Sequence, residues 1–111
     1  MDYSKLSDFE INKAVAESLG VKFTQDGLEI YVDVFDEQHG DFFPESLNYC
    51  NNPSDAWPII VENKIDLEFE YDGSCFARGF CFKSLKTIGA NKEKNPLRAA
   101  MIVYLMMKEG E

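Results

Sequence analysis

Two runs of alternating residues, on either side of Asp72-Gly73, limit the fold of this chain more than any other feature. Before the turn, residues 65–72 alternate four apolar side chains with four acids. A two-residue period is that of a β-strand with one buried face. Asp-Gly is a typical hairpin turn. The second run, residues 75–82, is therefore expected to return as the antiparallel partner.

We expect the acidic face of the first strand to be exposed to solvent, whereas the buried face of the second strand stays open. The acids of the first strand share one face: Asp66, Glu68, Glu70 and Asp72. In the second strand, one face carries phenylalanines and the other carries small residues and cysteines, and either could be buried. Arg78 belongs to the phenylalanine face and is expected to pair with an acid across the hairpin.

Helix signals stand near both ends of the chain. Ser7 and Glu10 fit a capping box, and Gly20 supplies the residue that ends the helix. Asn95-Pro96 combines a cap with proline at the first helical position and starts a last helix, residues 96–109. This last helix is apolar nearly all round, so it should be central or shared with a second copy in a homo-oligomer.

The middle of the chain is harder to divide. Asn52-Pro53 is again a cap followed by proline, but Pro58 would interrupt a helix. Either one helix begins near Pro53 and bends at Pro58, or a turn precedes a short helix over residues 57–63. We favour the second, with Trp57 in a buried face that also holds Ile60 and Val61. Residues 28–35 alternate as a strand, and a short strand is also expected at residues 21–23. Residues 36–44 and 83–94 are expected to be loops.

The fold we expect is α+β, with a single domain over residues 1–111. A small, largely antiparallel sheet packs with an N-terminal helix, a short middle helix and an apolar C-terminal helix. The three cysteines are odd in number and have no paired spacing, so buried free thiols are expected. The longest apolar run has nine residues, too few to cross a membrane, and we expect a cytoplasmic protein.

Charge excludes one class of function. Acids outnumber Lys and Arg by 20 to 11, which gives a net charge of −9. General binding to nucleic acid needs basic residues, so no direct contact with DNA or RNA is expected. The charge is uneven, because residues 78–98 are basic. An acidic surface that attracts a basic partner protein is the functional interpretation, with the row from Asp66 to Asp72 as its candidate face.

No residue set has the spacing of a known catalytic or metal site. His39 has acids around it, but the pattern matches no calcium or zinc loop. The chain also lacks the glycine-rich phosphate motifs and the nucleophile motifs of hydrolases. We therefore expect no metal and no cofactor, and a protein that is more consistent with binding than with catalysis.

A small-molecule or nucleotide site is the alternative function. It would use the basic segment 83–98 and the start of the last helix, where free N–H groups favour anions. Trp57 or Tyr49 would stack on the ligand. The candidate ligand or partner residues are Tyr49, Asn51, Asn52, Asp55, Trp57, Lys92, Lys94 and Arg98.

Three blocks of the sequence together resemble a known family. They read YSKLSDFEINKAVAESLG, NYCNNPSDAWPIIVENKIDL and NPLRAAMIVYLMMKEG. In this order they are similar to the NinX family of temperate lambdoid phages and prophages. The resemblance implies a phage or prophage accessory protein that acts in the bacterial cytoplasm. It implies no catalytic residues, so the partner, a host or phage protein, has to be inferred from the chain itself.

Overall fold

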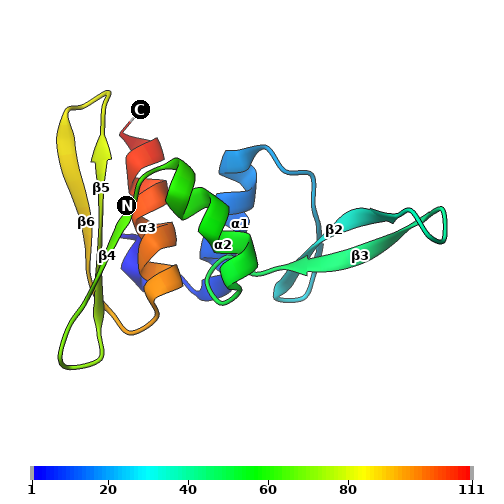
Figure 1. Cartoon of the computed structure of the whole chain (residues 1–111), viewed down its shortest axis with the longest axis horizontal. Helices are drawn as coiled ribbons and strands as arrows, with labels where there is room; N and C mark the ends of the chain where they lie inside the picture. The colour runs from blue at the N-terminus through cyan, green and yellow to red at the C-terminus, as the bar shows by residue number, and fades with distance from the viewer. Residues whose placement is uncertain (1, 111) are drawn as a thin grey trace.

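The computed structural model describes residues 2–110, apart from the side chains of residues 91 and 92, and has three α-helices and two small antiparallel sheets (Figure 1). The helices are a short 3-10 helix η1 (Tyr3–Lys5), α1 (Asp8–Leu19), α2 (Pro53–Glu62) and α3 (Pro96–Glu109). One sheet has the order β1-β2-β3, with β1 (Thr24–Asp26), β2 (Glu29–Asp36) and β3 (Asp41–Leu47). The other has the order β4-β5-β6, with β4 (Asp66–Phe69), β5 (Cys75–Cys81) and β6 (Lys86–Glu93). The α+β prediction is confirmed, with two sheets in place of one.

Helix α1 forms as its local signals predict. The Ser7 side chain accepts a hydrogen bond from the Glu10 N–H at 3.1 Å, and the Glu10 carboxylate accepts one from the Ser7 N–H at 3.2 Å. Gly20 ends the helix with φ of 72°, a left-handed conformation that costs little only without a Cβ. Ile11 and Val15 are fully buried, so the predicted apolar stripe is the inward face.

Helix α3 is the centre of the fold. The Asn95 side chain caps it by accepting hydrogen bonds from the N–H groups of Leu97 and Arg98. Sheet β4-β5-β6 packs along one side of α3, and α1 and α2 pack on the other (Figure 1). Its buried residues are Ala99, Ala100, Met101, Ile102, Val103, Tyr104, Leu105 and Met107. The chain itself therefore covers the apolar surface on which the expectation of a homo-oligomer rested.

The structure settles which face of β5 is inside. The small residues and cysteines face α3, whereas Phe80 is on the solvent side. A Cβ on Gly79 would lie 2.6 Å from the Met107 sulfur, so the close approach of β5 to α3 depends on glycine there. On the outer face, Arg78 bonds Glu68 of β4 at 3.1 Å, which confirms the predicted pair.

The predicted division of the middle segment is wrong. One helix runs through Pro58 from the Asn52 cap, whose side chain accepts from the Ser54 N–H at 3.0 Å. Pro58 is exposed and is the sixth residue of α2, so the helix loses the hydrogen bond that an N–H at this position would donate to the carbonyl four residues earlier. The start at Pro53 turns Ala56, Ile59 and Ile60 inward. Trp57 is therefore 59% exposed, and Val61 is exposed too.

Two predicted loops contain strands. Strand β3 begins at Asp41 inside the expected loop 36–44 and continues to Leu47, and β6 occupies most of the expected loop 83–94. The short strand expected at residues 21–23 is also wrong, because the first strand begins at Thr24. Phe42 and Phe43 favour a strand, but Pro44 and the polar residues after it reduce the strand propensity of β3. Pairing with β2 over its whole length decides its conformation.

Candidate functional site

Sheet β1-β2-β3 projects from the body of the molecule (Figure 1). We call residues 24–47 the arm. Only its base is anchored in the core, where Ile30 is 1% exposed. Along β3 every residue but Leu47 is exposed. Because β1 has only three residues, the outer part of the arm is a two-stranded ribbon, open to solvent on both faces.

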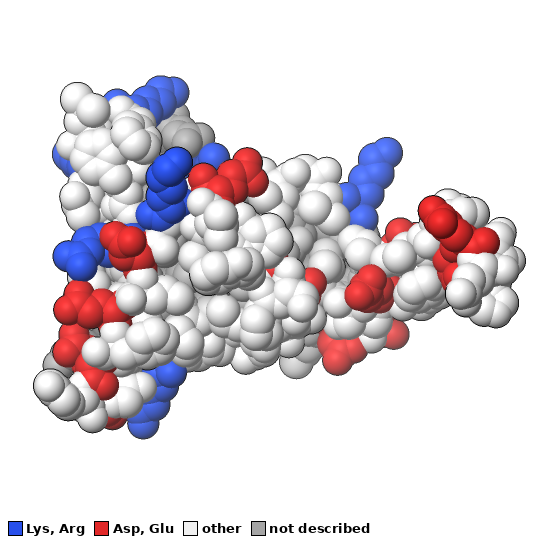
Figure 2. Space-filling view, viewed as in Figure 1, with Lys and Arg blue, Asp and Glu red and all other residues white. Residues whose placement is uncertain are grey.

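The arm carries most of the net negative charge of the chain. Between residues 24 and 47 there are seven acids and no Lys or Arg, whereas the rest of the chain has thirteen acids and eleven bases. The arm acids are Asp26, Glu29, Asp33, Asp36, Glu37, Asp41 and Glu45. Figure 2 shows acidic groups along the arm, whereas basic and acidic groups alternate on the body. The charge asymmetry in the sequence is thus also an asymmetry in space.

Aromatic side chains accompany the acids on the arm. Phe35 and Phe42 form a ring pair with centroids 5.1 Å apart, and these residues are 51% and 63% exposed. Phe43 is exposed on the opposite face of the ribbon, beside Val34 in register. His39, in the turn, lies 2.5 Å from a carboxylate oxygen of Asp36. Large exposed apolar groups rimmed by polar ones are typical of interaction surfaces.

A polar network joins the ends of three segments that are distant in sequence. Asn51 donates to Asp8 at 3.1 Å and to the Asn48 side chain at 3.0 Å. Asn95 donates to the Asn51 side chain at 3.0 Å and to the Cys50 carbonyl at 2.6 Å. These contacts tie the start of α1 and the start of α3 to the segment before α2.

Arg98 is the most heavily bonded side chain of that network. It donates to Asp8 at 2.7 Å and to the carbonyls of Ser4 and Leu6 at 3.1 and 2.6 Å. Its Nε lies 3.4 Å from Glu93. The Arg98 side chain is 13% exposed. These contacts use the guanidinium inside the fold, so Arg98 is a poor candidate for an anion site.

The other predicted ligand residues do not form one site. Lys94 is exposed, and the side chain of Lys92 lies outside the part of the chain that the structure describes. Tyr49 is 4% exposed, and burial raises the pKa of its hydroxyl. Trp57 is exposed on α2, so it and Tyr49 cannot both stack on one solvent-accessible ligand.

Asn52 and Asp55 have structural contacts. Asn52 caps α2, and a carboxylate oxygen of Asp55 accepts from the Asn48 N–H at 2.9 Å. Both contacts fix the segment that leads from β3 into α2. The asparagine-rich stretch, residues 48–52, therefore holds the backbone between β3 and α2 in place.

The acids of the predicted acidic face are exposed but lie among other side chains. Asp66 and Glu68 are exposed on β4, but Arg78 and Phe76 of β5 lie directly opposite them in register. Glu70 and Asp72 lie in the turn beyond β4, where Asp72 accepts from the Ser74 N–H at 2.9 Å. A basic partner would therefore meet a weaker field here than on the arm.

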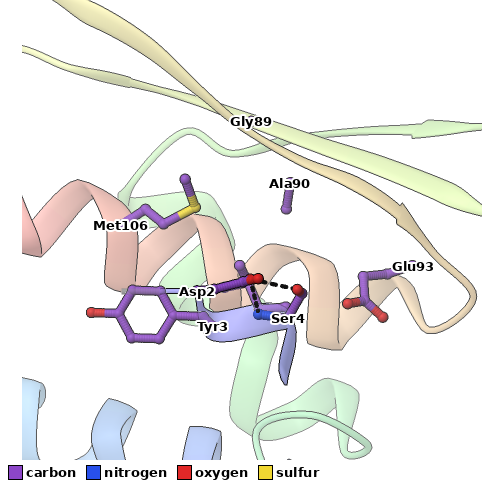
Figure 3. A pocket seen from close by; sticks show the side chains of 8 residues that line it. Asp2, Tyr3, Ser4, Gly89, Ala90, Glu93 and Met106 are labelled. Carbon is purple, nitrogen blue, oxygen red and sulfur yellow. Dashed lines mark hydrogen bonds between the residues drawn. The ribbon is translucent and has the colours of Figure 1, made fainter. Parts of the chain in front are cut away.

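A cavity of about 220 Å³ lies between η1, β6 and α3 (Figure 3). Its apolar lining includes Ile102 and Met106. Its polar groups are held by neighbours, because Asp2 accepts from the Ser4 N–H and hydroxyl, and Glu93 faces Arg98. This arrangement supplies no base aimed at a nucleophile.

The cysteines and acids form no reactive centre among the described residues. Cys50, Cys75 and Cys81 are buried thiols, as predicted. Burial, with a smaller contribution from Asp8, raises the pKa of the Cys50 thiol to about 12. A protonated thiol is a poor nucleophile. Within residues 2–110, no three side chains of His, Cys, Asp or Glu are grouped as metal ligands.

The residues that sequence reasoning missed are those of the arm. The signal was present as the absence of Lys and Arg over residues 24–47. The prediction of a loop at residues 36–44 hides it, because a loop gives their acids and phenylalanines no common surface.

Comparison with known proteins places the chain in a family. None of the described helices is long and apolar enough to span a lipid bilayer. Searches of curated proteins and of solved structures give no match. The family described as "Bacteriophage P22, NinX" matches residues 2–108, nearly the whole chain. The chain therefore belongs to the NinX family of phage proteins.

Proposed function

We propose that this phage accessory protein is non-enzymatic and binds a basic host or phage protein through the acidic arm. The observation that carries the proposal is the arm itself, with seven acids, no Lys or Arg and three exposed phenylalanines. Acids attract and orient a basic partner over a distance, and aromatic side chains supply contact area once the surfaces meet.

The arm is a better candidate than the face at Asp66 and Glu68. Opposite charges on neighbouring strands cancel much of the field there, because Glu68 bonds Arg78. The arm has no basic side chain to do the same. It also projects from the body, so a partner can reach both of its faces (Figure 1).

The same charge argues against other partners. Seven acids would repel the phosphates of a nucleic acid and the arm of a second copy. The nucleotide alternative, which depends on residues 83–98, loses support because Arg98 is bonded to Asp8 and to two backbone carbonyls.

The test is affinity capture from a bacterial lysate with matched charge variants. One variant replaces Asp33, Asp36 and Glu45 of the arm by their amides, and the control replaces Asp66, Glu68 and Glu70 in the same way. We expect the arm variant to lose a partner that the control retains, and binding to the unmodified protein to weaken steeply as salt rises. Loss with the control variant, or binding that salt does not change, would contradict the proposal.

A further inference from the structure

The arm sheet has a vacant strand position beside β2. Strand β1 pairs with β2 only from Glu29 to Tyr31, whereas β3 pairs with β2 from Ile30 to Asp36. Beyond Tyr31, no strand among the described residues pairs with this edge of β2 on the β1 side. Five residues, at about 3.3 Å each, leave roughly 17 Å of open edge, the length of an ordinary short strand.

The register shows which backbone groups face this position. The two-residue turn at Gly27-Leu28 makes Asp26 and Glu29 a hydrogen-bonded pair, so the backbone groups of Glu29 and Tyr31 point toward β1. Along an antiparallel strand, successive residues point to opposite edges. The N–H and C=O groups of Asp33 and Phe35 consequently point into the vacant position.

The opposite edge of the arm is protected. By the same alternation, Phe42, Pro44 and Ser46 point their backbone groups away from β2, toward the outer edge of β3. Pro44 has no N–H, and proline on an edge strand is a common means of preventing a further strand from adding. The two edges therefore differ, and the open one is that of β2.

The surroundings of the open edge indicate what would fit there. A hollow of about 150 Å³ lies where β1 begins, lined by Lys22, Phe23, Thr24, Tyr31 and Asp33. Lys22 is a base at this end of the edge, whereas the far part of β2 and the turn after it carry Asp33, Asp36 and Glu37, with the Phe35–Phe42 pair on one face. Lys or Arg side chains on an added strand would meet these carboxylates, and Arg could also stack on the rings.

We infer that an extended segment of the partner protein, rich in Lys or Arg, adds as a strand to the edge of β2 at Val32–Asp36. This inference rests on the proposed function, because it specifies how the basic partner binds the arm. Strand addition supplies backbone hydrogen bonds for affinity and alternate side chains for specificity. It would also complete a ribbon that has only two strands over this length, an arrangement that is marginal in water.

The probe is a labelled hexapeptide of alternating lysine and valine, with a hexapeptide of alternating glutamate and valine as its charge control. Amide hydrogen exchange is measured by NMR on the full chain, with and without peptide. We expect exchange to slow about tenfold at Asp33 and Phe35 on addition of the basic peptide, and to stay unchanged at Phe42 and Ser46. Slowing at Phe42 and Ser46 instead would overturn the inference.

Substitutions separate the contribution of backbone hydrogen bonds to peptide binding from the contribution of charge. Asp33→Ala and Asp33→Pro both remove the carboxylate, but only the second removes the N–H that faces the vacant position. Ser46→Pro removes an N–H from the opposite edge. We expect Asp33→Pro to bind the basic peptide about tenfold more weakly than Asp33→Ala, and Ser46→Pro to bind like the unmodified chain. Exchange rates at core residues show that each variant is folded.

The outcomes distinguish the mode of binding from the function. If binding depends on charge but Asp33→Pro and Asp33→Ala bind alike, strand addition is wrong and the acidic arm still binds a basic partner. If both hexapeptides bind equally, or neither binds, strand addition and the charge complementarity of the arm both fail. Protection of the Asp33 and Phe35 amides could instead rise with protein concentration in the absence of peptide. That result would identify a second copy of the chain as the occupant and overturn the inference of a basic partner segment.

Discussion

Replacing Arg98 by alanine tests whether this residue holds the fold together or is free for an anion. The side chain reaches Asp8 at 2.7 Å and the carbonyl of Leu6 at 2.6 Å, and it is 13% exposed. Its removal would leave Glu93, whose side chain is 18% exposed, without its cationic partner. It would also leave the carbonyls of Ser4 and Leu6 without this donor.

The size of the effect follows from the burial of each partner. Breaking a buried ion pair on one side costs about 3–5 kcal/mol. The side chain of Asp8 is 44% exposed, so water compensates part of its loss. We therefore expect Arg98→Ala to lower the free energy of unfolding by about 2–4 kcal/mol. For a domain of this size, that lowers the Tm by roughly 10–25 °C.

Arg78 supplies the matched control, because it pairs with Glu68 at 3.1 Å with side chains 47% and 59% exposed. Exposed pairs contribute about 0–1 kcal/mol, so Arg78→Ala should change the Tm by only a few degrees. Thermal and urea unfolding followed by circular dichroism measure both variants. Equal stability of the two would refute the structural role of Arg98 and return it to the candidates for anion binding.

Other substitutions test the rest of the interior. Asn12 is 7% exposed and bonds the Cys50 N–H and the Asn48 side chain, so Asn12→Ala should cost about 2–3 kcal/mol by urea unfolding, whereas an unchanged midpoint would contradict the network. Trp57→Ala should cost under about 1 kcal/mol, because Trp57 is 59% exposed, whereas Ile60→Ala should cost about 2–5. Acrylamide should also quench the native fluorescence of Trp57, and resistance to quenching would show that it is buried. Burial raises the pKa of the Cys50 thiol from 9.0 to about 12, so the unfolded chain loses this proton first and stability should fall as pH rises from 9 toward 12. Replacing Cys50 by alanine should flatten the pH dependence of unfolding in that window, and an unchanged slope would contradict the assignment.

The elements that the sequence predicted well are those with local signals at their ends. Ser7, Glu10 and Gly20 bond within one or two turns of the chain, so they define α1 without any knowledge of the fold. Asn95-Pro96 does the same for α3. The hairpin around Asp72-Gly73 is local as well, whereas its register, with Phe69 opposite Cys75, was left open because either face of residues 75–82 could be buried.

The errors lie where distant contacts decide. Strand β3 exists through its pairing with β2, because Pro44 at its middle reduces the preference of this segment for a strand. The orientation of α2 is decided by the contacts of Ile59 and Ile60 with the core. Trp57, which the sequence suggested as the buried residue of this segment, is therefore exposed. The network at Asn51 and Arg98 joins residues about 45 positions apart or more, which spacing along the chain does not show.

Asn48 connects the arm to the body of the molecule. This residue follows Leu47, the last residue of β3, and its N–H donates to Asp55 while its side-chain oxygen accepts from Asn12 and Asn51. The chain therefore leaves the arm directly into the polar network. Buried Ile30 holds the other strand at the same level, because it is the register partner of Leu47.

An arm anchored in this way differs from a flexible charged tail. A tail loses conformational freedom when it binds, and that loss weakens the complex. Here the network around Asn48 and the core around Ile30 fix the base of the ribbon, so its direction is set before a partner arrives. The outer ribbon has no core of its own and can adapt to the added strand. In the proposed complex, the asparagine-rich stretch would contribute to binding from a distance by holding the open edge of β2 in place.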